Sequence, residues 1–157
     1  MATVATLILL MPLLGFLTLL LLGHYLSEKQ VGVIGTGVVA ASFIFAIISF
    51  VLLLHDSSRE VTVNLFAWIS VGTLHVPAAL LVDPLSITMC LFVTGISALI
   101  HLYSTGYMHG EKDFRKFFIY LNLFVFSMLL LVLANNLVLT FVGWEGVGCL
   151  LYTSRCV

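Results

Sequence analysis

The sequence predicts an all-α membrane protein with five membrane-spanning helices and a short hairpin-like surface segment between the second and third helices. Hydrophobic residues make up 62% of the 157 residues and charged residues only 8%, whereas an ordinary soluble domain contains roughly 25% charged residues. The mean hydropathy is +1.23. Several uncharged apolar runs approach the ~20 residues that a helix needs to cross a bilayer.

The composition also excludes other classes of protein. Six basic and seven acidic residues give a net charge of −1, which leaves no basic surface for nucleic acid. Cys90, Cys149 and Cys156 are scattered, without a C-x-x-C pair or a histidine at ligand spacing. They therefore predict neither a metal site nor a disulfide framework, and we interpret them as small apolar packing residues.

The first two spans are predicted over residues 4–22 and 31–54. A signal peptide would place a base before its apolar core, but the first base is Lys29, so we retain the first run as a span. The second span begins with Gly32, Gly35 and Gly37. These glycines either allow close helix contact or reflect the high glycine content of membrane helices, and both interpretations stay open.

A polar stretch at residues 55–60 takes the chain out of the membrane. Residues 61–65 then alternate apolar and polar side chains with β-branched residues, and aromatic residues follow up to Gly72. This pattern predicts a short hairpin over residues 61–76 on the membrane surface, with an interfacial helix as the alternative. Trp68 suits the aromatic belt in either case. We interpret His75 as a solvated loop histidine because no second metal ligand lies beside it.

The third span is predicted from residue 85 to about residue 104. Asp83 is placed to cap its N-terminus, and Pro84 occupies the first helical position, where its missing N–H costs nothing. His101 lies near the far end of this span. It is a candidate proton relay because the unperturbed pKa of histidine is near neutrality. The alternative is a helix-end histidine that the backbone or interfacial water satisfies.

A charge-rich loop at residues 106–116 precedes a fourth span at residues 117–133. Asn135 and Asn136 then lead directly into the fifth span, and so short a link predicts that spans four and five are antiparallel and in contact. Arg59 lies alone on one side of the membrane, so the positive-inside rule predicts that the N-terminus is outside. The bases predicted on the inner side are Lys29, Lys112, Arg115, Lys116 and Arg155.

Glu145 is the one acid that falls deep in a predicted span. At ~1.5 Å per residue, a helix that enters the hydrocarbon near Leu137 places Glu145 about 12 Å inside a layer ~30 Å thick. A central charge costs roughly 2.5–3.5 kcal/mol to insert. Such residues usually face a polar interior, have a partner and mark a proton or ion route. The alternative is a structural carboxylate that joins two helices or stays protonated.

The apolar segments also contain recognisable motifs. The sequence resembles the amino-terminal part of the subunit L family of NADH-quinone oxidoreductase, the largest antiporter-like membrane subunits of respiratory complex I, called subunit 5 in mitochondria. The resemblance is strongest over residues 81–148 and weakest in the first two spans. The matching segments are Leu-Val-Asp-Pro-Leu-Ser at 81–86, Tyr-Met at 107–108, Phe-Phe-Ile-Tyr-Leu-Asn-Leu-Phe at 117–124, Ala-Asn-Asn-Leu at 134–137 and Gly-Trp-Glu-Gly-Val-Gly at 143–148.

The resemblance implies a partial antiporter-like fold. Family members have two inverted repeats of five helices, each with a proton half-channel, and spans four and five would be the first two helices of the first repeat. Glu145 would be the carboxylate of that half-channel, paired in the family with a lysine on a later, broken helix. Residues 1–80 would form an N-terminal transmembrane region, and residues 81–157 would begin the proton-translocating domain.

The implied function is that of a membrane subunit of proton-pumping NADH:quinone oxidoreductase. NADH, FMN, iron–sulfur clusters and quinone are then expected in other subunits, with no cofactor in this chain. Its partners would be neighbouring membrane subunits and lipid, and protons its only small-molecule substrate. The expected location is a bacterial inner membrane, with the mitochondrial inner membrane as the alternative.

Two alternatives to this function remain. The chain could be the A-type component of a multisubunit Na⁺/H⁺ antiporter, or a structural membrane protein that conducts nothing. Residues 153–157 also depart from the family pattern, since a base appears where an apolar helix should continue. We therefore expect the sequence to be part of a longer gene or to end at an assembly junction.

Overall fold

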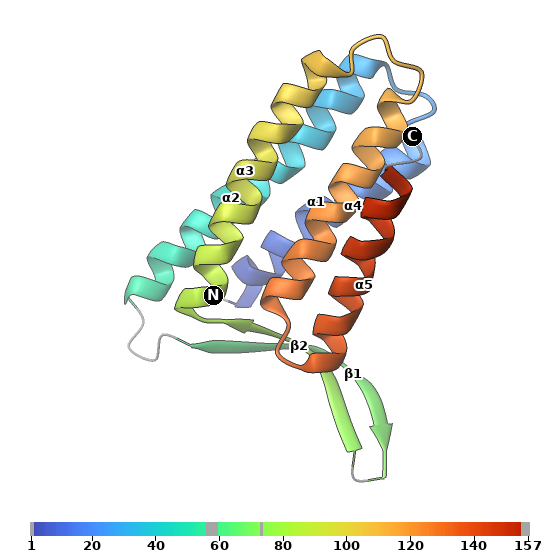
Figure 1. Cartoon of the computed structure of the whole chain (residues 1–157). Helices are drawn as coiled ribbons and strands as arrows, with labels where there is room; N and C mark the ends of the chain where they lie inside the picture. The colour runs from blue at the N-terminus through green and yellow to red at the C-terminus, as the bar shows by residue number, and fades with distance from the viewer. Residues whose placement is uncertain (1, 56–59, 73, 155–157) are drawn as a thin grey trace.

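The chain folds into a bundle of five helices with a two-stranded hairpin at one end (Figure 1). The computed structural model describes residues 2–55, 60–72 and 74–154. Arg59 and Arg155, which were used to predict the orientation, lie outside these residues. The elements are α1 (Ala2–Leu22), α2 (Glu28–His55), β1 (Val61–Val71), β2 (Leu74–Val82), α3 (Pro84–Tyr107), α4 (Phe114–Leu133) and α5 (Leu137–Ser154).

The predicted membrane fold is confirmed. In the described part of the chain, α1, α2, α3 and α4 are each long and apolar enough to cross a membrane, and α5 is a shorter apolar helix. With 18 residues, α5 is about 27 Å long, close to the thickness of the hydrocarbon layer. An α-helix suits this environment because its backbone groups are hydrogen-bonded within the segment.

The predicted cap of the third helix is also confirmed. The Ser86 N–H donates to Asp83 Oδ1 at 2.6 Å, and the Asp83 N–H donates to Ser86 Oγ at 2.9 Å. These two bonds form a capping box, with Pro84 at the start of the helix. The helix continues to Tyr107, three residues further than predicted, so the loop that follows it is shorter than expected.

The hairpin is present, and the alternative of an interfacial helix is wrong. β1 and β2 are antiparallel, with Val61 opposite Val82, and Gly72 in the turn has a φ of +58° that favours glycine. β2 continues six residues beyond the predicted end at residue 76. The reason is burial, because the part of β2 near the bundle is in the core whereas the tip projects away from it (Figure 1). The buried residues are Ala78, Ala79, Leu80 and Val82. The predicted domain boundary at residue 80 falls inside β2 and stays a prediction.

The short link between α4 and α5 holds the hairpin against the bundle. The Asn135 N–H donates to the Ala79 carbonyl at 3.0 Å, and Asn136 Nδ2 donates to the Pro77 carbonyl at 2.7 Å. Asn136 Oδ1 also accepts the Leu139 N–H at 3.0 Å, which caps the start of α5. One amide side chain therefore fixes both β2 and α5.

Glycines in α1 and α2 allow these helices to approach α3 and α4 closely. A Cβ on Gly35 would lie 2.8 Å from Phe118 Cδ1, and one on Gly32 would lie 3.0 Å from Thr105 Cγ2. A Cβ on Gly37 would meet nothing within 4 Å. Close contact is therefore the correct interpretation for Gly32 and Gly35, but not for Gly37.

Asn136→Ala should destabilise the fold, because it removes both the α5 cap and the bond to Pro77. We expect a loss of about 1–2 kcal/mol in the free energy of unfolding, measured by thermal or denaturant unfolding in detergent. Asn135→Ala is the matched control, since Asn135 binds β2 through its backbone N–H, which alanine keeps. Equal stability of the two variants would contradict the role of the Asn136 side chain.

Gly35→Ala should destabilise the bundle by about 1–3 kcal/mol, because the added methyl group collides with the Phe118 ring. Gly37→Ala, two residues along the same helix, should cost nothing measurable. The midpoints of thermal unfolding of the two variants test this. If Gly37→Ala were destabilised and Gly35→Ala were not, the face of α2 that packs against the other helices would have been assigned wrongly.

Candidate proton-transfer residues in the membrane helices

The position of Glu145 follows from how α5 packs on α4. Two glycines of α5 lie directly against α4: a Cβ on Gly143 would be 2.7 Å from the Leu131 backbone nitrogen, and one on Gly146 would be 2.7 Å from Ser127 Oγ. Leu139 and Leu150 are buried on the same face of α5. The spacing of these four residues is that of one helical stripe, and this stripe is the face that α4 covers.

Glu145 lies outside this covered stripe. At 100° per residue, its Cα is about 130° around the helix from the centre of the stripe, and its side chain is exposed. Within the described residues its carboxylate forms no hydrogen bond or ion pair. The expectation that Glu145 faces a polar interior is therefore not met within the described residues. The small residues Gly143 and Gly146, and not Glu145, form the contact of α5 with α4.

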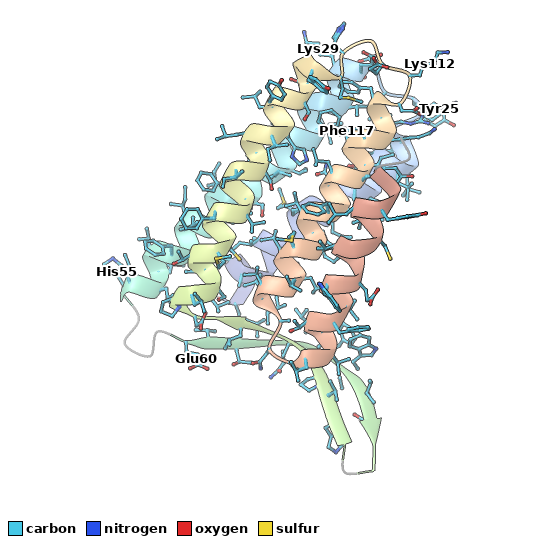
Figure 2. All side chains as sticks on the ribbon, in the orientation of Figure 1. Tyr25, Lys29, His55, Glu60, Lys112 and Phe117 are labelled. Atoms are coloured by element: carbon cyan, nitrogen blue, oxygen red, sulfur yellow. The ribbon has the colours of Figure 1, made fainter. Side chains whose placement is uncertain are left out.

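The position of Glu145 along its helix agrees with the predicted start of the span. It is eight residues into α5, about 12 Å from the hairpin end of the helix. The described basic side chains are far from it: Figure 2 shows Lys29 and Lys112 together at the end of the bundle opposite the hairpin, where the loop between α3 and α4 lies. No described lysine is thus placed to neutralise this carboxylate.

His101 lies further from the end of its helix than predicted. It lies six residues before the end of α3 and is fully buried between helices. Its Nδ1 is 2.7 Å from the Ser97 carbonyl oxygen, and its ring centroid is 5.9 Å from that of Phe118. Its Nε2 is buried and has no partner among the described residues. The longer α3 and its contact with α4 explain the difference.

The structure does not bring His101 and Glu145 together. His101 contacts α4 at Phe118, whereas Glu145 lies on α5 beside Gly146, which meets α4 at Ser127. Nine residues separate Phe118 from Ser127, which is about 13 Å along the helix axis. Any proton transfer between the two candidates would need intermediate groups or water.

Sequence reasoning missed two polar residues inside the bundle, namely Thr36 on α2 and Asn122 on α4. Asn122 is fully buried, and both Asn122 Oδ1 and Thr36 Oγ1 have no partner in the described part of the chain. The signal was present for Asn122, since it is an amide within the apolar fourth span. Thr36 gave no comparable signal because threonine is common in membrane helices.

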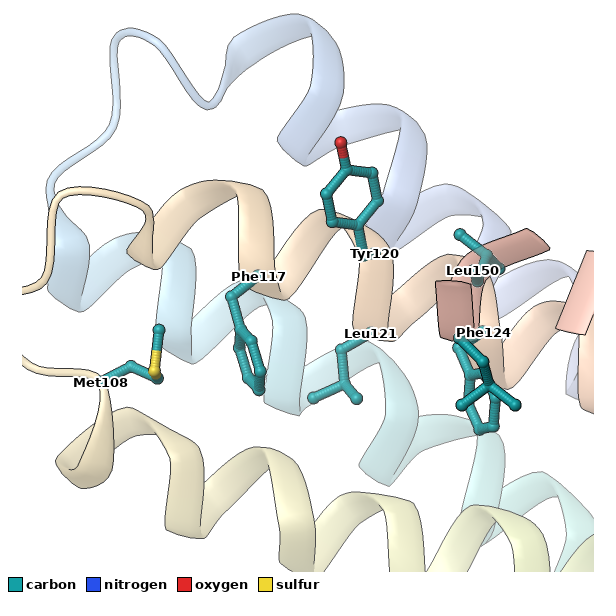
Figure 3. Close-up of a pocket in the computed structure, with 7 residues that line it drawn as sticks. Met108, Phe117, Tyr120, Leu121, Phe124 and Leu150 are labelled. Carbon is teal, nitrogen blue, oxygen red and sulfur yellow. The ribbon is translucent and has the colours of Figure 1, made fainter. Parts of the chain in front are cut away.

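The groove beside α5 in Figure 3 offers no polar route to Glu145. It has a volume of about 360 Å³, and Tyr120 provides the only hydroxyl among its lining side chains. Its remaining lining residues are Met108, Phe117, Leu121, Phe124, Leu150 and Leu151.

Among the described residues, no three histidine, cysteine, aspartate or glutamate side chains gather where they could hold a metal ion. Cys90 is buried and Cys149 is exposed.

Comparison with known proteins shows which proteins this chain is similar to. The family model described as NADH-Ubiquinone oxidoreductase (complex I), chain 5 N-terminus matches residues 68–118. NADH-quinone oxidoreductase subunit L of Buchnera aphidicola is 40% identical over 146 residues, which are 93% of this chain and 24% of the relative. The chain is a homologue of the amino-terminal part of these subunits. It is an integral membrane protein, as its four long apolar helices also indicate.

Two further relatives agree. NADH-ubiquinone oxidoreductase chain 5 of Allomyces macrogynus is 42% identical over 139 residues, covering 88% of this chain and 22% of the relative. Subunit L of Escherichia coli is 39% identical over 142 residues, covering 90% of this chain and 23% of the relative. The chain thus spans less than a quarter of the length of these curated relatives. The family model covers the hairpin tip and His101, but Glu145 lies beyond its matched residues.

Proposed function

We propose that this chain forms the amino-terminal part of a membrane subunit of a proton-pumping NADH:quinone oxidoreductase, and that Glu145 contributes to a proton half-channel. The observation that supports this most directly is a carboxylate halfway along an apolar helix, on the face that α4 leaves uncovered, in a homologue of subunit L. NADH, FMN, iron–sulfur clusters and quinone belong to other subunits in this proposal.

The uncovered face of α5 has room for a partner of Glu145. Gly148 follows Glu145 by three residues and so lies beside it on the helix surface, and a Cβ on Gly148 would meet nothing within 4 Å. A cation that approached here would favour the ionised carboxylate, and its withdrawal would favour proton uptake. Two coupled groups of this kind take up and release protons as a unit.

His101 is the second candidate in this proposal. Its buried Nε2 has no described protein partner, so this nitrogen is open to exchange a proton with a small molecule. A relay through His101 needs water, because the other buried groups near it are amide and hydroxyl side chains rather than acids or bases.

Glu145→Gln in the assembled complex should lower the number of protons translocated per electron, since glutamine keeps the size of the side chain but cannot release a proton. The test is proton uptake into membrane vesicles during NADH oxidation, normalised to the electron-transfer rate. Glu145→Asp should retain part of the activity.

The control is Glu111→Gln, in the exposed loop before α4, which should leave the proton stoichiometry unchanged. Unchanged stoichiometry in Glu145→Gln would reject the half-channel and favour a structural role. Sodium-dependent transport without NADH oxidation would favour the A-type component of a multisubunit antiporter.

We also propose that the N-terminus and the hairpin face outward, and that the loop between α3 and α4 faces the inside of a bacterial cell, or the matrix if the protein is mitochondrial. Bases gather at this loop, where the Gly110 N–H lies 3.3 Å from Glu28 Oε2 and Arg115 Nη1 lies 3.2 Å from His24 Nδ1. The positive-inside rule places such an end inside. The described bases there are Lys29, Lys112, Arg115 and Lys116.

A membrane-impermeant maleimide should therefore label His75→Cys in intact cells and Lys112→Cys only in inside-out vesicles. Both variants would be made after replacing the native cysteines, and both positions are exposed. The opposite labelling pattern would reverse the proposed orientation.

The outer part of the hairpin is the proposed contact with a neighbouring membrane subunit. Phe66 is 60% exposed and Trp68 is 41% exposed, and exposed aromatic side chains of this kind favour protein or headgroup contacts. Phe66→Ser should reduce recovery of the assembled complex without loss of the folded chain. If the variant assembled as well as the wild type, the proposed contact would be rejected, and lipid rather than a subunit would cover this surface.

A further inference from the structure

The turn between α1 and α2 and the loop between α3 and α4 border a polar cleft at the end of the bundle opposite the hairpin. The cleft has a volume of about 280 Å³, and Figure 2 shows Tyr25 and Lys112 at this end. His24, which follows α1, lines the cleft together with charged residues of α2, the loop and α4. These charged residues are Glu28, Glu111, Lys112, Arg115 and Lys116.

Arg115 is fixed in this cleft by its contacts with the end of α1. A Cβ on Gly23 would lie 2.8 Å from Arg115 Cδ, so the stem of the arginine occupies the space that glycine leaves open. Its Nη1 lies 3.2 Å from His24 Nδ1. A guanidinium only donates, so His24 accepts through Nδ1 and carries its proton on Nε2. Both side chains therefore present hydrogen-bond donors.

The other charges around the cleft neutralise each other only in part. Glu28 Oε2 accepts the Gly110 N–H at 3.3 Å, and Lys116 Nζ lies 2.7 Å from Asp113 Oδ1. The second contact is an exposed ion pair, which contributes little to stability, so Lys116 can exchange this partner for another. Lys112 forms no ion pair within the described residues.

This end of the bundle has an excess of hydrogen-bond donors and of positive charge. If the neighbouring Lys29 and Asp113 are counted with the cleft, four bases face three acids. The excess of one positive charge matches the single negative charge of a phosphodiester. The charged oxygens of a phosphodiester accept hydrogen bonds, whereas ammonium and guanidinium groups only donate them.

Leu26 connects the cleft to an apolar hollow on α2. It lines both cavities, and the hollow has a volume of about 280 Å³ with Val33 and Ile34 in its wall. These two residues lie further along α2, toward the middle of the bundle. Tyr25, the neighbour of Leu26, is 85% exposed, and exposed tyrosines at helix ends are typical of the headgroup level. The polar cleft is thus at the headgroup level, and the hollow leads toward the hydrocarbon.

We propose that the cleft and the hollow together bind one anionic phospholipid. Its phosphate lies between Lys112 and Arg115, and one acyl chain lies along Leu26 and Val33. The guanidinium can donate two parallel hydrogen bonds to the phosphate oxygens, and basic pockets beside membrane helices suit anionic headgroups. A free phosphate would fill only the cleft, so the adjoining hollow favours a lipid. The site belongs to α1, α2 and α4 and does not depend on Glu145.

Native mass spectrometry of the purified chain in detergent tests this site. Phosphatidylglycerol and phosphatidylcholine with the same acyl chains would be compared as probes. We expect the chain to retain phosphatidylglycerol several-fold more than phosphatidylcholine, and an excess of inorganic phosphate should not displace it. Lys112→Gln and Arg115→Gln should each lower this retention several-fold. Leu26→Ser should lower the retention of both lipids.

Arg59→Gln is the charge-matched control, because it removes one positive charge from the link between α2 and β1 and should leave retention unchanged. Lys112 is exposed and forms no described ion pair, so Lys112→Gln tests the site even if Arg115→Gln does not fold. Equal retention of the two lipids, or the same retention in Lys112→Gln as in Arg59→Gln, would overturn the proposal. Displacement of the lipid by inorganic phosphate would identify a free-phosphate site and would also overturn it.

Discussion

The structure depends on one constraint: a polar group inside a hydrocarbon layer needs a hydrogen-bond partner. The helices satisfy their backbone groups internally, and the places where the regular structure ends are satisfied by side chains. Asp83 and Ser86 do this at the start of α3, and Asn136 does it at the start of α5 while also binding β2. The hairpin, the α4–α5 link and the start of α3 are therefore joined at one end of the bundle by a few short polar contacts.

The same constraint separates two kinds of polar residue within the bundle. Asn122 and His101 are enclosed by neighbouring helices, and each has one satisfied atom and one atom without a described protein partner. Glu145 is on the uncovered face of α5. The carboxylate is therefore accessible to a side chain from another segment, whereas the two enclosed side chains are not.

Sequence patterns anticipated most elements of the fold but not all their ends. The hairpin was expected to end at residue 76 because the alternating pattern stops there, yet β2 continues to Val82 since the bundle buries Ala78, Ala79 and Leu80. His101 was expected near the interface because the end of α3 was placed too early. Gly32, Gly35 and Gly37 look equivalent in the sequence, but only the first two face a neighbouring helix at close range.

The sequence by itself determined that the chain is a membrane protein, the order of its helices, the capped start of α3 and the position of Glu145 halfway along an apolar segment. These properties depend on hydropathy and on local spacing, which require no knowledge of neighbours. Only the tertiary structure decided that Gly143 and Gly146 of α5 contact α4 and leave Glu145 exposed, and that His101 and Asn122 are fully buried between helices. These features depend on the rotation and register of packed helices, which result from contacts between residues far apart in the chain.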